Sequence, residues 1–135
     1  MRDVIRFDPG VAEVLVAYCR AELPIEACGY LVGEGEHVER FLPLRNAAGS
    51  PTRFELDPYE QLAAERALEE AGEVVVGVAH SHPAGENTPS DTDLADAARF
   101  DPLGAWIHVI VQPSSESIRA FRLLDGAAEE LEVET

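Results

Sequence analysis

A run of apolar residues in the middle of the chain ends directly in a pair of histidines. Residues 74–79 have the sequence Val-Val-Val-Gly-Val-Ala, which is typical of a buried strand, and His80, Ser81 and His82 follow at once. Alternate residues of a strand point to the same face, so the imidazoles of His80 and His82 should point the same way, with Ser81 directed away from them. The end of this strand is therefore a place where two ring nitrogens could act together.

A loop and a helix start follow the two histidines. Residues 83–89 contain two prolines and a glycine and should form the loop, and Ser90 then precedes Asp93 by three positions. This is the pattern of a helix N-terminus, with Ser90 as N-cap and an acid at N3. It also places Asp93 where it could supply a third metal ligand, and three protein ligands with a vacancy for water are typical of catalytic zinc. The residues alone leave both interpretations open.

The order His-Ser-His, seven residues that begin with Pro83, Ser, two residues, Asp closely resembles the signature of the JAMM (MPN+) metalloprotease family. The upstream glutamate segment of that signature is similar to Leu23–Gly33, with Glu26 at the key position. Asn46 and residues 54–58 are further family-like features, and the resemblance spans about residues 8–124. It implies the JAMM fold, which is similar to that of cytidine deaminases. A deaminase itself is disfavoured, because the Pro-Cys-x-x-Cys piece is absent.

The resemblance also implies a ligand set and a mechanism. One Zn²⁺ per chain would be held by His80, His82 and Asp93, with Glu26 as general base and then general acid, and Ser90 would stabilise the oxyanion. Glu26 opens an apolar strand, where a carboxylate without a structural duty costs stability. The alternative for Glu26 is an exposed side chain at a helix–strand junction, and the alternative for Ser90 is the helix cap.

Similar small prokaryotic members cleave after the C-terminal Gly-Gly of ubiquitin-like or sulfur-carrier proteins. The resemblance therefore implies a zinc-dependent peptidase or isopeptidase with such a carrier as its partner. The chain lacks the long insertions with which deubiquitinating members contact ubiquitin chains, so simple trimming of a tail is the expected reaction. The alternative is a non-catalytic MPN scaffold that binds a partner protein, although such members usually lose the metal ligands.

Composition narrows the function classes further. A length of 135 residues and a hydrophobic fraction of 46% suit a single domain, residues 1–135, with one core. The net charge of −16 opposes binding to nucleic acid or anionic membranes. No apolar run approaches the ~20 residues of a membrane span, and the N-terminus lacks the apolar core of a signal peptide. We therefore expect a cytoplasmic protein in which Cys19 and Cys28 are buried free thiols.

Periodicity and turn residues predict an α+β fold, a mixed and largely antiparallel sheet flanked by helices. The first helix should start with Asp8 as N-cap and Pro9 at N1 and end before Pro24, and the second should start with Asp57 as N-cap. His108 interrupts an apolar strand and is expected to be structural. The expected elements are a helix from Pro9, strands at 27–33 and 37–44, a helix to about 71, a strand at 74–79, a helix at 91–98, strands at 105–112 and 117–124, and a final edge strand at 130–133.

Overall fold

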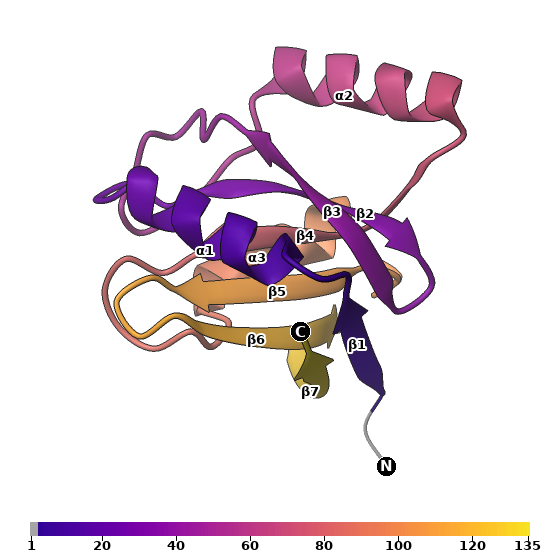
Figure 1. The fold of residues 1–135 in the computed structure, drawn as a ribbon. Coiled ribbons are helices and arrows are strands. Elements are labelled where there is room, and N and C mark those ends of the chain that lie inside the picture. The colour runs from indigo at the N-terminus through magenta and orange to yellow at the C-terminus, as the bar shows by residue number, and fades with distance from the viewer. Residues whose placement is uncertain (1–2) are drawn as a thin grey trace.

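Seven strands close into a barrel in the computed structural model, which describes residues 3–135 (Figure 1). The order around the barrel is β1-β3-β2-β4-β5-β6-β7. The pairs β1–β3, β1–β7 and β4–β5 are parallel and the other four are antiparallel, which confirms the predicted mixed, largely antiparallel sheet. The strands are β1 Val4–Phe7, β2 Cys28–Glu34, β3 His37–Leu44, β4 Val74–Ser81, β5 Ile107–Gln112, β6 Ser117–Leu124 and β7 Ala127–Glu134.

Three helices lie outside the barrel: α1 (Val11–Ala21), α2 (Pro58–Ala71) and α3 (Asp91–Phe100). Helix α1 crosses the front of the barrel and α3 lies behind it, while α2 stands above the strands (Figure 1). Helix α2 has the predicted Asp57 cap, whose carboxylate accepts hydrogen bonds from the N–H groups of Tyr59 and Glu60, and it ends at Gly72. Because Leu68 is its one buried residue, α2 is held mainly by its ends.

The start of the chain differs from the prediction. A four-residue strand, β1, precedes the first helix, and α1 begins at Val11 with Gly10 as N-cap, not with Asp8 as N-cap. The N–H of Asp8 donates to the carbonyl of Val38, which extends the pairing of β1 with β3, and its carboxylate contacts His37. These contacts with β3 hold Asp8 in the sheet, so it does not cap α1. Gly10 makes the turn into the helix at φ 87°, a region that suits glycine.

The end of the chain also differs. The predicted edge strand at 130–133 is the eight-residue strand β7, and it is not an edge. It pairs with β6 on one side and with β1 on the other, so the two ends of the chain close the barrel. Strand β1 pairs in parallel with distant segments, which leaves no local pattern in it. Residues 127–129 of β7, which were also missed, pair with β6 across the turn at 125–126.

Strand β4 lies in the middle of the sheet and carries the histidines to one end of the barrel. It pairs with β2 in a register that sets Cys28 opposite His80, and with β5 in a register that sets Val111 opposite Ser81. A Cβ on Gly77 would lie 2.1 Å from the carbonyl oxygen of Ile107, so glycine lets β4 and β5 approach. The residues just before β2 are thereby placed next to the end of β4.

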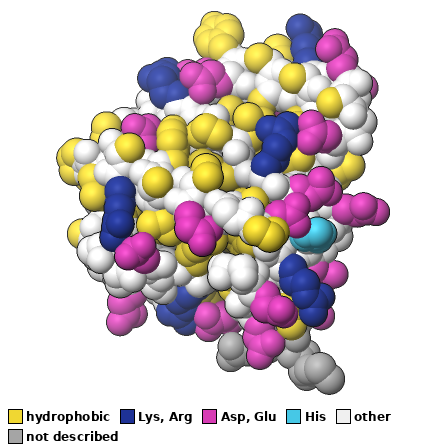
Figure 2. Space-filling view, viewed as in Figure 1, with side chains coloured by type: hydrophobic (Ala, Val, Ile, Leu, Met, Phe, Trp, Pro, Cys, Tyr) yellow, Lys and Arg dark blue, Asp and Glu magenta, His cyan; other side chains and the backbone are white. Residues whose placement is uncertain are grey.

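The surface agrees with the acidic composition. Acidic side chains are spread over the face shown in Figure 2 among scattered arginines, as expected for a solvated surface. Among residues 3–135, no helix is both long and apolar enough to cross a membrane. Cys19 and Cys28 are both free and buried, as predicted.

Candidate metal centre

The two histidines at the end of β4 point to one side, as their spacing predicts. The centroids of their rings are 5.1 Å apart, and both side chains are buried. Ser81 points the other way, and its hydroxyl accepts a hydrogen bond of 2.8 Å from the N–H of Ala27. Ser81 thereby ties the end of β4 to the segment that carries Glu26.

Asp93 brings its carboxylate to both histidines. Its Oδ2 lies 3.3 Å from Nε2 of His80 and 3.0 Å from Nε2 of His82. The same oxygen accepts a hydrogen bond from the N–H of Ser90, and the Ser90 hydroxyl accepts one from the N–H of Asp93, so the predicted capping box is present. The cap and the approach to the histidines thus coexist. Burial would raise the pKa of Asp93, but the contacts with the two histidines outweigh it and lower that pKa.

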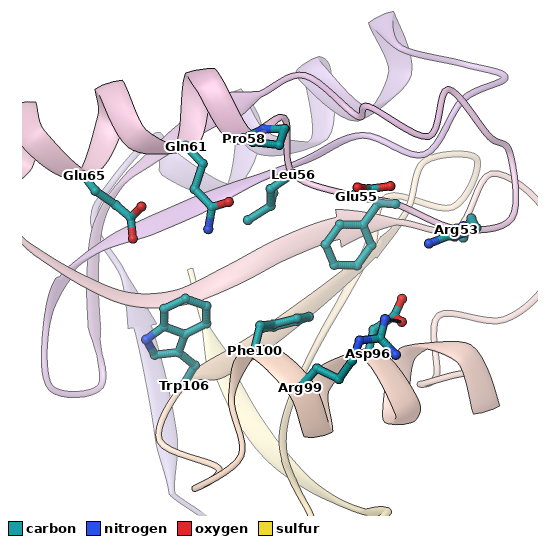
Figure 3. Close-up of a pocket in the computed structure, with 11 residues that line it drawn as sticks. Arg53, Glu55, Leu56, Pro58, Gln61, Glu65, Asp96, Arg99, Phe100 and Trp106 are labelled. Atoms are coloured by element: carbon teal, nitrogen blue, oxygen red, sulfur yellow. Dashed lines mark hydrogen bonds and ion pairs between the residues drawn. The ribbon is translucent and has the colours of Figure 1, made fainter.

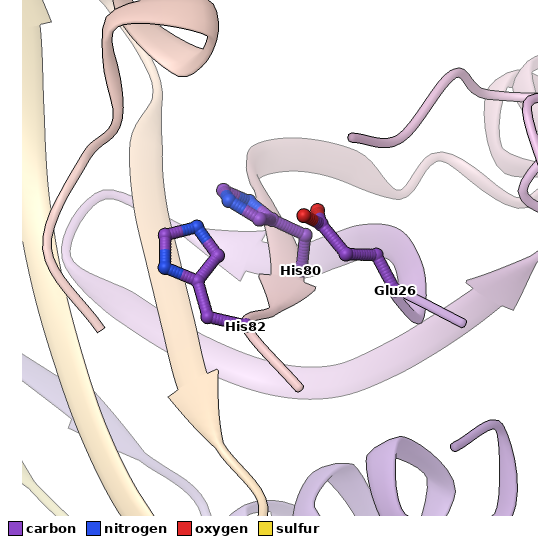
Figure 4. A group of neighbouring side chains, drawn as sticks. All are labelled: Glu26, His80 and His82. Carbon is purple, nitrogen blue, oxygen red and sulfur yellow. The ribbon is translucent and has the colours of Figure 1, made fainter. Parts of the chain in front are cut away.

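Glu26 completes the cluster from the other side and is buried, not exposed. Figure 4 shows its carboxylate turned toward the histidine rings. The backbone fixes its place, because the Glu26 N–H donates to Ser50 over 2.9 Å and its carbonyl accepts from the Asn46 side chain over 3.0 Å. Its Oε1 is buried without a hydrogen-bond partner among the described residues. Burial raises the pKa of Glu26 to about 8, with His82 opposing the rise and Asp93 adding to it.

A carboxylate oxygen of Glu26 lies within 4.8 Å of a ring nitrogen of each histidine. Two sets of ligands are therefore available, His80 and His82 with Asp93 or the same pair with Glu26. We favour Asp93, because its oxygen lies close to Nε2 of both rings and is held there by the helix cap. The partnerless oxygen of Glu26 remains directed at the same space, where a group that exchanges protons is needed.

Several residues that support the histidines escaped the sequence prediction. Nδ1 of His82 donates a hydrogen bond of 2.8 Å to the carbonyl of Glu86, which fixes the ring with Nε2 facing Asp93. The buried side chain of Asn87 donates to the carbonyls of Ile110 and Ser117, each over 3.2 Å, and so anchors that loop to the sheet. Asparagine in a proline-bounded loop is ordinary turn composition, so no sequence signal separates Asn87 from its neighbours.

Phe54 is the other unpredicted support, although its segment was noted as family-like. Its ring stacks on His80 with centroids 4.5 Å apart and planes 26° apart. Asn46 holds the segment, because its Oδ1 accepts from the N–H groups of Ala48 and Glu55, each over 3.0 Å. The stacking fixes the orientation of the His80 ring.

Two hollows flank the cluster. A groove of about 570 Å³ runs between α2 and α3 and has Phe54 in its lining (Figure 3). A second hollow of about 550 Å³ opens directly on Glu26, His82 and Ser90. The cluster therefore has one hollow directly beside it and a groove that comes near it through Phe54, which stacks on His80.

His108 has the structural role that was predicted. It is buried, and its Nε2 lies 2.8 Å from Oδ2 of Asp101. Asp101 also accepts hydrogen bonds from the N–H groups of Ala105 and Trp106. Because these two N–H groups are taken by a side chain, β5 starts at Ile107 and not at residue 105.

Comparison with known proteins identifies the family. Residues 8–124 match the model of the prokaryotic homologues of the JAB domain, Prok-JAB. The chain belongs to this family. This JAB domain is 42% identical over 130 residues to a CysO-cysteine peptidase of Mycobacterium tuberculosis, covering 94% of the chain and 86% of that protein. It is 36% identical over 118 residues to a probable TtuB-protein conjugate cleaving protease of Thermus thermophilus, covering 87% of the chain and 74% of that protein.

Solved structures support the same fold. The solution structure of a protein from Desulfitobacterium hafniense matches this JAB domain with a TM-score of 0.82 and 33% identity, over 96% of the chain and 91% of that protein. A JAB1/MPN domain protein from Archaeoglobus fulgidus has the same fold, with a TM-score of 0.63 and 23% identity over 98% of each chain. The predicted JAMM-type fold is confirmed, and the named relatives support the prediction that the JAB domain is a hydrolase.

The raised pKa of Glu26 has a measurable consequence for stability in the presence of a chelator. An unfolded glutamate ionises near pH 4.5, but Glu26 in the folded chain keeps its proton to about pH 8. The wild type should therefore lose stability relative to Glu26→Gln as the pH rises from 4.5 to 8, because burying the carboxylate charge costs free energy. At pH 9 the variant should be more stable by about 2 kcal/mol or more.

Urea unfolding of both proteins at pH 5, 7 and 9 measures this difference. The gap should be small at pH 5 and widen toward pH 9. An equal gap at all three values would mean that Glu26 is not held protonated by burial.

Proposed function

We propose that this JAB domain is a zinc-dependent peptidase or isopeptidase that hydrolyses the bond after the C-terminal Gly-Gly of a ubiquitin-like or sulfur-carrier protein. The observation that carries the proposal is the buried carboxylate of Glu26, whose partnerless oxygen faces two histidines that share Asp93. A buried carboxylate without a partner costs stability, so this arrangement is best explained by use in a reaction. We further propose that residues 1–135 form one catalytic domain.

The donor set fits zinc. Two imidazoles and one carboxylate are typical ligands of a catalytic zinc site, and we propose that His80, His82 and Asp93 hold one Zn²⁺. The His82 Nδ1 bond to the Glu86 carbonyl and the stacking of Phe54 on His80 would hold both rings ready. Zinc bound there would supply a Lewis acid and lower the pKa of a bound water to about 7.

Glu26 would transfer the proton of the reaction. In this proposal its carboxylate takes a proton from the attacking water and then delivers it to the leaving nitrogen, so that one group serves first as base and then as acid. Burial suits this role because it raises the pKa of Glu26 toward neutrality. The hydroxyl of Ser90 would donate to the oxyanion that forms on the carbonyl. Its oxygen already accepts from the Asp93 N–H, which leaves the hydroxyl proton free to donate.

The substrate class rests on the relatives and on the shape of the site. The names of two relatives specify a CysO-cysteine bond and conjugates of TtuB. The groove between α2 and α3 and the hollow beside Glu26 leave room for an extended chain on each side of the cluster. A Gly-Gly tail carries no side chains, which suits a groove between two helices.

Metal analysis combined with a cleavage assay tests the proposal. Purified wild type should contain about one zinc per chain and trim fusions that carry a Gly-Gly tail, while His82→Ala should contain little zinc and be inactive. His37→Ala is the matched control, because His37 is an exposed histidine whose ring contacts Asp8 and takes no part in the cluster. Equal zinc in His82→Ala and wild type, or a wild type that stays metal-free in excess zinc, would favour a non-catalytic scaffold.

A further inference from the structure

The hollow beside Glu26, which we name the leaving-side pocket, is built from three separate segments. Its volume is about 550 Å³, and its lining includes the three residues to which we assign chemistry on this side, Glu26, His82 and Ser90. The remaining walls come from the end of the α1–β2 connection, the loop before α2 and the residues after β4. They are Leu23, Pro24, Pro51, Thr52, Pro83 and Ala84.

The segments are tied to each other and to the cluster. The N–H of Glu26 donates to the carbonyl of Ser50, which binds the first wall to the second. The wall after β4 follows His82 directly, and Nδ1 of His82 is bonded to the carbonyl of Glu86 farther along the same loop. The leaving-side pocket is therefore fixed relative to the reacting centre.

The walls of the pocket carry no positive charge. Five of the six are apolar and the sixth, Thr52, is uncharged. None of the nine lining residues is an arginine, and the whole chain contains no lysine. A charged side chain that entered would thus find no counter-ion in these walls, whereas an uncharged one could pack against proline and leucine.

The position of Glu26 tells which part of a substrate belongs here. The group that protonates the leaving nitrogen must lie within hydrogen-bond reach of it. Glu26 lines the leaving-side pocket and is absent from the lining of the groove between α2 and α3, which reaches the cluster through Phe54. The groove therefore suits the carrier tail, and the pocket suits the residue on the other side of the scissile bond.

We propose that the leaving-side pocket binds the side chain of the first residue after the scissile bond and favours uncharged side chains there. This inference rests on the proposed function and adds a specificity to it. Alanine, cysteine and valine are of the class that the walls fit. Glutamate and lysine are disfavoured, since the walls offer no group that pairs with their charge.

A set of fusions tests the selectivity. Five otherwise identical fusions carry Ala, Cys, Val, Glu or Lys directly after Gly-Gly, and kcat/KM is measured for each with the zinc-loaded enzyme. The three uncharged residues should be cleaved at least about tenfold more efficiently than Glu and Lys. Equal efficiency for all five would overturn the proposed selectivity while leaving the peptidase activity intact. Cleavage of none of them would instead overturn the proposed function, and the pocket assignment with it.

A charge placed on the wall sharpens the test. Leu23 is 45% exposed, so Leu23→Arg adds a guanidinium at the rim without emptying the core. It should raise the ratio of kcat/KM for the Glu fusion to that for the Ala fusion at least about fivefold. Leu62→Arg is the matched control, since Leu62 is 50% exposed on α2 and lines neither hollow. An equal change for the Glu fusion in both variants would show that Leu23 does not face the leaving residue.

Discussion

Replacing Glu26 by Gln should lower kcat for a Gly-Gly-tailed carrier about 10²–10⁴-fold while leaving the zinc content near that of the wild type. The amide keeps the size of the side chain but neither accepts the proton of the attacking water nor returns one to the leaving nitrogen. Because the carboxylate of Glu26 has a partnerless buried oxygen, the exchange breaks no hydrogen bond of that atom. Turnover and metal content are measured on the same preparations.

The zinc content decides between the two sets of ligands that the geometry allows. Glu26 offers an oxygen within 4.8 Å of both histidines. If Glu26 were a ligand, Glu26→Gln would lose both zinc and activity. Asp93 would then serve only to cap α3. Glu13→Gln is the matched control, because Glu13 is an exposed glutamate on α1. Wild-type turnover in Glu26→Gln would remove Glu26 from the chemistry altogether.

The sequence predicted the arrangement of the side chains near the end of β4 better than it predicted the closed barrel. His80 and His82 follow a strand at a spacing of two, and the period of a strand alone turns both rings to one side. Ser90 and Asp93 stand at the spacing of a capping box, a local pattern that the backbone enforces. These residues are close in sequence, so their geometry follows from local rules. Glu26 lies 54 positions before His80 and was placed by family resemblance only.

The elements that were missed depend on contacts between distant segments. Strand β1 is four residues long and exists because β3 and β7 pair with it, and Asp8 is drawn into that sheet and not into a helix cap. Phe54 and Asn87 support the histidines through contacts across the fold, a stacked ring and two carbonyls of the sheet. Their types are common in any core or loop, so their roles emerge only when the chain is folded.

Asp93 combines half of the α3 capping box with the proposed role of metal ligand, and two variants should separate the two. Asp93→Ala removes both the carboxylate that faces the histidines and one half of the capping box. Its zinc affinity should fall at least about 100-fold, since an open site keeps only three protein ligands. Ser90→Ala removes the other half of the same cap and leaves the carboxylate in place. It should keep its zinc but lose about 10²–10³-fold in kcat if its hydroxyl serves the oxyanion.

The free energy of unfolding of both variants is measured in the presence of a chelator, so that the loss of the cap is compared without bound metal. Each variant loses a cap of α3, worth about 1 kcal/mol, and Asp93→Ala also loses the contacts with His80 and His82. Asp91→Asn is the matched control, because Asp91 is an exposed acid in the same first turn. A loss of stability in both variants with a loss of zinc in Asp93→Ala alone would show that the cap and the ligand are separate roles of one helix start. Zinc loss in Ser90→Ala as large as in Asp93→Ala would show instead that the cap positions the carboxylate, and that the metal site depends on it.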